Sequence, residues 1–198
     1  MFRKFILILV TGLLFASSGK AQLADKATLH GGFSYQFVTL TPLGSSQKFL
    51  FPYYGLSLGM NYVLAHSNDQ ASIGISPTGN ISFSFSNYGI NLMLQAPVYL
   101  TARLGAGATP YNEQKFGIGA GIGSVFTYMV SPTGLTNSRL RQGWVNPSAM
   151  GELSIKTRFS NYLFRVNWSL FSPTVEVDDL NGDEIQFGNW GISILYNF

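Results

Sequence analysis

The chain of 198 residues contains no cysteine, and only 11% of its residues are charged, against roughly a quarter in a typical soluble domain. Disulfides therefore cannot stabilise it, and an exported form would need a closed hydrogen-bonded ladder instead. Beyond residue 15, no stretch approaches the roughly 18 unbroken apolar residues of a transmembrane helix. Apolar residues still make up 46% of the chain and are spread by alternation, which favours strands that face lipid.

The N-terminus has the layout of a secretory signal peptide. Arg3 and Lys4 precede the apolar run 5–15, and small residues follow it. We expect cleavage before Gln22, which gives a signal peptide over residues 1–21 and a single domain over residues 22–198. The alternative is an uncleaved anchor helix, for which the run is short.

Loss of the signal peptide changes the charge balance. The chain has 12 basic and 9 acidic residues, and three of the basic ones, Arg3, Lys4 and Lys20, belong to the signal segment, so nine of each sign remain. No remaining segment concentrates Lys and Arg among aromatic residues, so the sequence predicts no nucleic-acid partner.

The last fourteen residues, 185–198, show the clearest alternation in the chain. Small or polar residues such as Asn189 and Ser193 separate large apolar ones, and this period of two predicts a strand with one face toward lipid and the other toward a lumen. The apolar face comprises Trp190, Ile192, Ile194, Tyr196 and Phe198.

Seven further segments alternate in the same way, at about residues 29–40, 53–65, 72–86, 90–108, 116–130, 147–157 and 162–170. Pro77 interrupts the third, but odd-numbered residues stay apolar on both sides of it. We predict one long strand, kinked or bulged at Pro77, and the alternative is a hairpin there that would add strands. The fold class is then all-β, an eight-stranded antiparallel up-and-down transmembrane barrel. Long loops are expected after the first, fifth and seventh strands, the last two at 131–144 and 173–184.

The terminal alternation ending in Phe198 resembles the C-terminal strand of bacterial outer-membrane barrels. Residues 97–105, PVYLTARLG, and 117–123, GIGAGIG, are similar to barrels of unassigned function common in Bacteroidota. The chain as a whole resembles the small barrels of the OmpA, OmpX and OmpW types. The resemblance implies the bacterial outer membrane as location, its lipid and the barrel-assembly machinery as partners, and an assembly signal formed by the apolar residues of the last strand. It carries over no catalytic residue.

Inward charges are the first candidate site. If the turn Arg158–Asn161 sets the register, Ser154 lies opposite Arg165 and Glu152 opposite Asn167, so that Arg165 reaches Glu152 diagonally. Arg103 and Lys156 add two more inward-facing cations. We predict a hydrogen-bonded plug in the lumen, and the alternative is a narrow, slightly cationic passage. The predicted network comprises Arg103, Glu152, Lys156, Arg165 and Asn167.

Four inward glycines in 117–123 weaken a strand, so a neighbour is expected to press close to them. Tyr99, Met129 or a tight curve of the wall could do so, and a ligand slot is the alternative.

Asp179, Asn181 and Asp183 have the first spacings of a calcium loop, but Glu184 stands where that loop needs its glycine. A hairpin tip at Asn181–Gly182 is the simpler interpretation, and no metal or cofactor is predicted.

The only histidines, His30 and His66, map near the periplasmic end, so no base is placed to activate a nucleophile at the outer rim. The sequence therefore predicts no enzyme. It favours a structural or interaction component of the envelope, with a possible protein partner. The alternative is a narrow pore or a route for small or apolar solutes.

Overall fold

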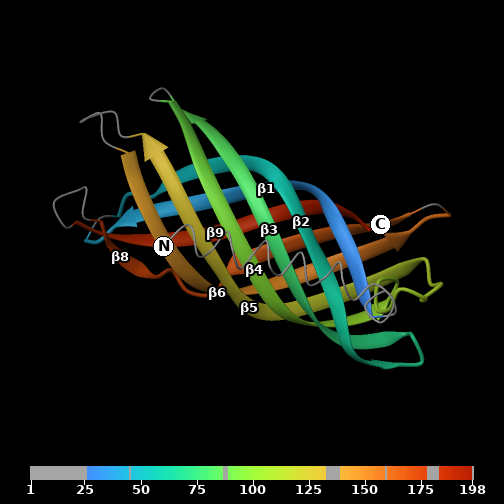
Figure 1. Ribbon diagram of the computed structural model, residues 1–198. Coiled ribbons are helices and arrows are strands. Elements are labelled where there is room, and N and C mark those ends of the chain that lie inside the picture. The colour runs from blue at the N-terminus through green and yellow to red at the C-terminus, as the bar shows by residue number, and fades with distance from the viewer. Residues whose placement is uncertain are drawn as a thin grey trace, which may run out of the picture.

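The computed structural model describes residues 26–44, 46–86, 89–132, 139–158, 160–177 and 183–197, which form a closed antiparallel barrel (Figure 1). From β1 to β7 each strand pairs with the next along the chain, β7 and β8 both pair with β9, and β1 pairs with β9 to close the wall. The strands are β1 (Ala27–Pro42), β2 (Phe49–Ser67), β3 (Ala71–Ser86), β4 (Gly89–Gly105), β5 (Phe116–Pro132), β6 (Arg139–Lys156), β7 (Asn161–Ser169), β8 (Thr174–Val177) and β9 (Asp183–Asn197).

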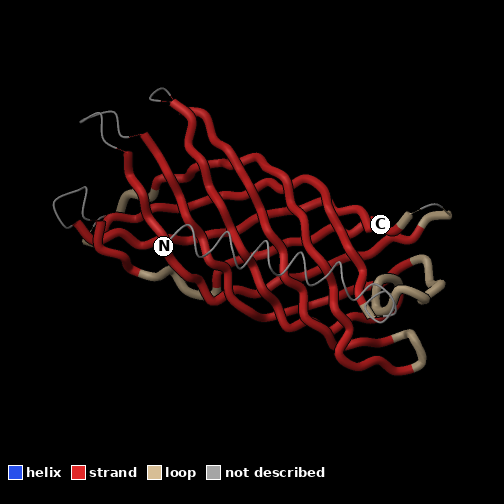
Figure 2. The backbone as a smooth tube through the Cα atoms, in the orientation of Figure 1, coloured by secondary structure: helices blue, strands red, loops and turns tan. Residues whose placement is uncertain are grey.

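The barrel is eight strands around, although nine segments are counted. β7 pairs with β9 as far as Trp168 and Trp190, and β8 pairs with β9 from Thr174 and Gln186 onward. β7 and β8 thus act together as one strand of the barrel wall, which is interrupted at residues 170–173. Figure 2 shows strands along nearly all of the described part of the barrel, with loops at its two ends and at the interruption between β7 and β8. The expected eight-stranded all-β barrel is confirmed.

The alternation that predicted the strands also divides the two faces. On β1, Phe33 is 72% exposed on the outside, whereas Ser34 beside it is 5% exposed inside. The outer wall carries Leu, Ile, Phe, Tyr and Trp, and most of the buried inward positions carry small or polar residues. None of the helices in the described part of the chain is long and apolar enough to cross a membrane.

β3 runs unbroken through Pro77, so the single-strand prediction is confirmed. Of the two distortions predicted at Pro77, a kink or a bulge, the bulge is wrong, because β3 keeps one register with β4 from Ala71 to Ser86. The kink stays a prediction. A proline removes one backbone donor but inserts no extra residue. The register shift lies on β2, between Val63 and Ala65.

The strands at the loop end are longer than the sequence predicted. β5 extends to Pro132 and β6 begins at Arg139, so ladder pairing takes up most of the expected loop 131–144. The expected loop 173–184 is likewise shortened, because β8 pairs with β9. Its tip, residues 178–182, lies outside the described residues. Continued pairing satisfies backbone groups that a loop would leave to water.

Two layers fill the lumen. Toward the loop end, inward side chains form an apolar cluster of Val38, Tyr53, Met93, Met129, Trp144, Ile185 and Phe187. Toward the end where β1 begins and β9 finishes, the buried residues are mostly polar and charged. The candidate site lies in this second layer.

Candidate functional site in the lumen

One row of the ladder places three charged side chains around four neighbouring strands. Arg103 on β4 pairs with Gly119 on β5, Gly119 pairs with Glu152 on β6, and Glu152 pairs with Arg165 on β7. All four positions face inward, since residues directly opposite each other share a face of the sheet. The row therefore has the order Arg, Gly, Glu, Arg.

Both arginines bind the carboxylate of Glu152. Arg103 Nε donates to Oε1 at 2.8 Å, and Arg165 Nη2 and Nε donate to Oε2 at 2.9 and 3.2 Å. The three side chains are almost fully buried, with 2% exposure for Arg103, 4% for Arg165 and none for Glu152. A buried carboxylate with a guanidinium on each oxygen is well compensated, although the trio keeps one positive charge in excess.

Each arginine also reaches polar groups on a strand that is not its neighbour, and Arg165 does so across the lumen. Arg103 Nη2 donates to Asn61 Oδ1 on β2 at 2.8 Å, and Arg165 donates to Ser76 and Thr78 on β3 at 3.2 and 3.1 Å. Ser76 in turn donates to the same Asn61 oxygen at 2.7 Å, which closes a ring of hydrogen bonds across the lumen.

Two further residues attach to this ring. Arg103 Nη1 donates to Thr101 Oγ1 at 2.9 Å, and His30 Nε2 lies 3.4 Å from Thr78 Oγ1. Six strands thus contribute side chains, namely β1, β2, β3, β4, β6 and β7. We call the ring and its attachments the lumen network, which comprises His30, Asn61, Ser76, Thr78, Thr101, Arg103, Glu152 and Arg165.

Sequence reasoning placed the charges inside but missed the uncharged members, Asn61, Ser76, Thr78 and Thr101. The only sequence signal for these residues was that they occupy inward-facing positions of the alternating strands, and many other small polar residues occupy such positions too.

The expected register of β6 and β7 is wrong: each residue of β6 lies opposite a residue of β7 that is two positions earlier in the chain than predicted. Glu152 lies directly opposite Arg165, and Ser154 lies opposite Leu163. The turn is residues 157–160 rather than 158–161, because Lys156 and Asn161 form the last pair and Thr157 N donates to Ser160 O at 2.7 Å. Starting the turn one residue earlier moves every partner on β7 by two.

Two residues of the expected network lie elsewhere. Lys156 sits at the terminus end of the barrel, and its Nζ donates to the backbone carbonyl of Asn112 in the connection between β4 and β5. Asn167 is buried one row away, opposite Met150 on β6 and Gly191 on β9. The structure therefore brings together Arg103, Glu152 and Arg165 but places these two apart from them.

The inward glycines of β5 make room for the side chains of the adjacent strands. A Cβ on Gly119 would lie 3.1 Å from Arg103 Cγ and 3.4 Å from Glu152 Cβ, and one on Gly121 would lie 3.1 Å from Met150 Cγ. Met129 does not press on them, since it belongs to the apolar cluster at the loop end. The atoms nearest to a Cβ built on Gly123 are backbone atoms of Val98 and Tyr99.

The apolar face of the last strand lies on the outer wall, as expected. Trp190, Ile192, Ile194 and Tyr196 are 39–50% exposed on the outer wall. Phe198 lies outside the described residues, so its part in an assembly signal stays a prediction.

The two histidines differ in setting. His30 is buried in the lumen, whereas His66 is half-exposed near the end of β2, opposite Ser72 on β3, with its Nδ1 3.4 Å from Asp69. Within the described part of the chain, no three metal-ligating side chains gather into a possible metal site. The ion pairs and hydrogen bonds of the lumen network join six strands, and they are suited to holding the wall closed.

Comparison with family models and with curated proteins gives no match. Among solved structures, the chain is similar to Neisserial surface protein A, with 9% identity, a TM-score of 0.50, and coverage of 87% of this chain and 98% of that one. It is also similar to Ail, the attachment invasion locus protein of Yersinia pestis, with 10% identity, a TM-score of 0.49, and coverage of 88% and 99%. For the N-terminal barrel domain of Pseudomonas aeruginosa OprF, the sequence identity is 12%, the TM-score is 0.43, and the match covers 88% of this chain and 98% of that one.

The protein therefore has the fold of the small eight-stranded β-barrels known from bacterial outer membranes. At this level of identity, the likeness defines the fold and leaves the function to be argued from the chain itself.

Proposed function

We propose that the protein is a bacterial outer-membrane barrel with a closed lumen, which serves the cell envelope as a non-enzymatic structural or interaction component. The main support for a closed lumen is that two layers of side chains fill it, one apolar and one charged.

The apolar layer closes the loop end. Trp144 and Phe187 stack with ring centroids 4.2 Å apart, and Tyr53 donates its hydroxyl to Met129 Sδ at 3.1 Å. These four side chains come from β2, β5, β6 and β9, so they meet from around the circumference, and none is more than 4% exposed. An ion would have to displace large, well-packed side chains to pass.

The charged layer closes the lumen a second time. Its ring joins β2 and β3 to β4, β6 and β7, so it spans the lumen from wall to wall. An eight-stranded barrel leaves an interior barely wider than its side chains. Opening it would separate buried charges, which costs several kcal/mol.

The location in a membrane is supported by the outer wall. Tyr162 and Tyr196 meet at one end of β7 and β9, and Trp168 lies opposite Trp190 six residues further along. Six residues correspond to roughly 20 Å of strand. Aromatic residues that bound an apolar band are typical of transmembrane barrels.

Cell fractionation tests the location. The mature chain should sediment with outer membranes and resist extraction at high salt. Recovery of the mature chain as a freely soluble protein would contradict the proposal.

Planar-bilayer recording tests the closed lumen. The wild-type barrel should give no reproducible channels, whereas Trp144→Ala combined with Glu152→Ala should give them, because each substitution removes one layer. Reproducible wild-type channels that Gly119→Leu abolishes would favour the pore instead.

Purification in mild detergent tests the interaction role. Cross-linking in intact cells, followed by solubilisation, should retain an envelope protein with the barrel. A lone monomer under all cross-linking conditions would count against that role and leave a purely structural one.

A further inference from the structure

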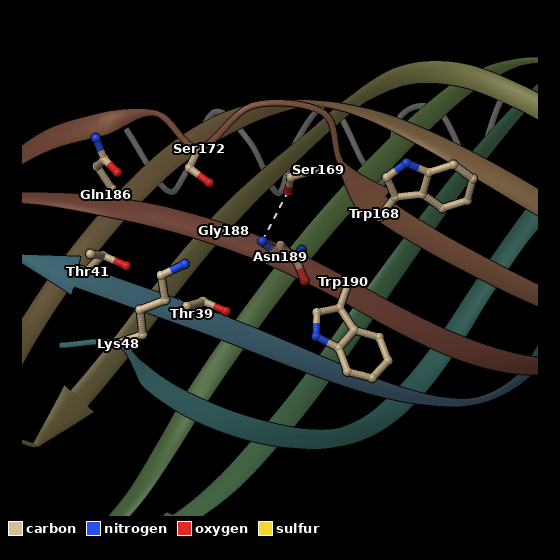
Figure 3. A pocket seen from close by; sticks show the side chains of 10 residues that line it. All are labelled: Thr39, Thr41, Lys48, Trp168, Ser169, Ser172, Gln186, Gly188, Asn189 and Trp190. Carbon is tan, nitrogen blue, oxygen red and sulfur yellow. Dashed lines mark hydrogen bonds between the residues drawn. The ribbon is translucent and has the colours of Figure 1, made fainter. Parts of the chain in front are cut away.

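A groove of about 370 Å³ lies on the outer wall near the loop end, where β1, β7 and β9 meet (Figure 3). Its lining comes from outward positions of β1 and β9, from the inward Asn189 of β9, from the end of β7 and the segment after it, and from the residue before β2. The lining residues that matter below are Thr39, Thr41, Lys48, Ser172, Gln186 and Gly188.

The interruption between β7 and β8 accounts for the groove. Ser169 to Pro173 lie opposite only Phe187 to Asn189, so the wall strand carries two residues more than its partner. Leu170 N still bonds to Pro147 O, which continues the ladder with β6, so the irregularity lies on the β9 side of the segment. There Asn189 N takes its partner from the Ser169 side chain at 3.1 Å, the dashed line in Figure 3. The extra length bends the segment out of the ladder, as in a bulge.

Gly188 lies at the floor of this groove. A Cβ there would lie 3.2 Å from Ser172 Oγ and 3.6 Å from Thr39 Cβ. The glycine thus keeps open a space that a larger side chain on β9 would fill.

The chemistry of the lining differs from the rest of the outer wall. Hydroxyl and amide groups from Thr39, Thr41 and Gln186 face outward here, at positions where the same strands carry apolar residues nearer the terminus end. Of the described residues that line the groove, Lys48 is the only charged one. A Lys ammonium is a compact donor suited to phosphate, while hydroxyls and amides suit sugar hydroxyls.

The groove also lies at the edge of the apolar band. Trp168 and Trp190 line its side toward the band, and they are 43% and 39% exposed. Indole rings favour the level of lipid headgroups because one end is apolar and the other can donate a hydrogen bond. Ile192 and Val166 continue the outer wall beyond the tryptophans with exposed apolar surface suited to acyl chains.

We propose that this groove binds the headgroup of a phosphorylated glycolipid from the leaflet at the loop end. Lys48 binds the phosphate, the threonines and Gln186 bind sugar hydroxyls, and the acyl chains lie along the wall below the two tryptophans. The inference rests on the proposed location in the outer membrane, since only a membrane-embedded barrel presents this wall to a lipid leaflet.

The test uses the mature barrel reconstituted in phosphatidylcholine vesicles with and without monophosphoryl lipid A. After gentle detergent release, native mass spectrometry counts the lipid A retained on each barrel. Gly188→Leu fills the groove and Lys48→Gln removes its cation. The matched controls are Gly143→Leu, an exposed glycine on the outer face of β6, and Arg141→Gln, an exposed cation on the same strand.

We expect the wild type and both controls to retain one lipid A in preference to phosphatidylcholine. Lys48→Gln should weaken this retention by about fivefold, as loss of one cation near a charged lipid surface predicts. Gly188→Leu should abolish it.

Equal retention by Gly188→Leu and wild type would overturn the proposal, and so would equal retention of phosphatidylcholine, which would mean unspecific boundary lipid. Binding of free glucosamine 1-phosphate or inorganic phosphate as tightly as lipid A would show that the acyl chains contribute nothing, and would overturn the lipid as the ligand.

Flotation of the vesicles distinguishes failure of the proposed lipid-binding groove from failure of the proposed membrane location. A barrel that does not float with the vesicles contradicts the membrane location, whereas a barrel that floats but retains no lipid A contradicts only the groove.

Discussion

Arg103 and Glu152 form a buried ion pair although their strands, β4 and β6, are not neighbours. The strand between them, β5, presents Gly119 at this level, and the absence of a side chain there lets the guanidinium cross to the carboxylate. The glycines of β5 therefore have a structural role in the lumen network: they leave the space through which its charges meet.

Filling that space should break the ion pair. Gly119→Leu would place a branched side chain where Arg103 Cγ is already 3.1 Å from a Cβ, so the free energy of unfolding should fall by about 1–3 kcal/mol or more. Gly119→Ala should cost less, because the contacting atoms belong to flexible side chains. Urea unfolding in detergent micelles, followed by tryptophan fluorescence, measures both.

Gly151→Leu is the matched control. Gly151 is on β6, next to Glu152, and nothing lies within 4 Å of a Cβ built there. Equal loss of stability in the two leucine variants would show that the barrel resists any bulk at these glycines and that the space over Gly119 is not special.

Removing the shared carboxylate should cost more than removing the whole trio. Glu152→Gln leaves two buried guanidinium groups without a counter-ion, and we expect a loss of about 3–5 kcal/mol. Replacing the three charges together, by Glu152→Leu, Arg103→Met and Arg165→Met, should be close to neutral by comparison. The same urea titration decides between them, with Lys156→Met as control, since that amine lies at the rim.

If the triple variant is less stable than Glu152→Gln alone, the arginines contribute mainly through Asn61, Ser76 and Thr78 rather than through the carboxylate.

The apolar layer should contribute comparably to stability. Trp144 is 4% exposed and stacks on Phe187, so Trp144→Ala should lower the free energy of unfolding by about 3–5 kcal/mol. Trp144→Phe keeps the stacking and should cost much less. Thermal unfolding followed by circular dichroism measures both, and an unchanged midpoint for the alanine variant would mean that the layer does not pack as tightly as its geometry indicates.

The β2–β3 turn should tolerate glycine and reject branched residues. Asn68 and Asp69 both have positive φ, at 46° and 56°, and Gln70 N donates to Ser67 O at 3.0 Å, which is the geometry of a type I′ turn. Asn68→Val should cost about 1–2 kcal/mol, whereas Asn68→Gly should be near neutral. Refolding yield into vesicles and urea unfolding both measure this, and equal behaviour of the two variants would contradict the turn assignment.

The two faces of each strand were predictable from the sequence because the pleat fixes a period of two locally. Phe33 and Ser34 take opposite sides of the wall whatever they pair with, and the same holds for Trp190 beside Asn189. The number of strands around the barrel and the continuity of β3 through Pro77 followed from that pattern alone.

Which inward residues meet was decided only by the closed structure. The turn between β6 and β7 begins at Thr157, one residue earlier than the polar composition of this stretch indicated, and this places Glu152 opposite Arg165 rather than opposite Asn167. Ser76 and Thr78 on β3 come within reach of Arg165 on β7 only because β1 pairs with β9 and closes the sheet. Alternation along one strand is set by covalent geometry, whereas contact across a lumen depends on the register of every strand between the two residues, so local pattern determined the faces and tertiary closure determined the network.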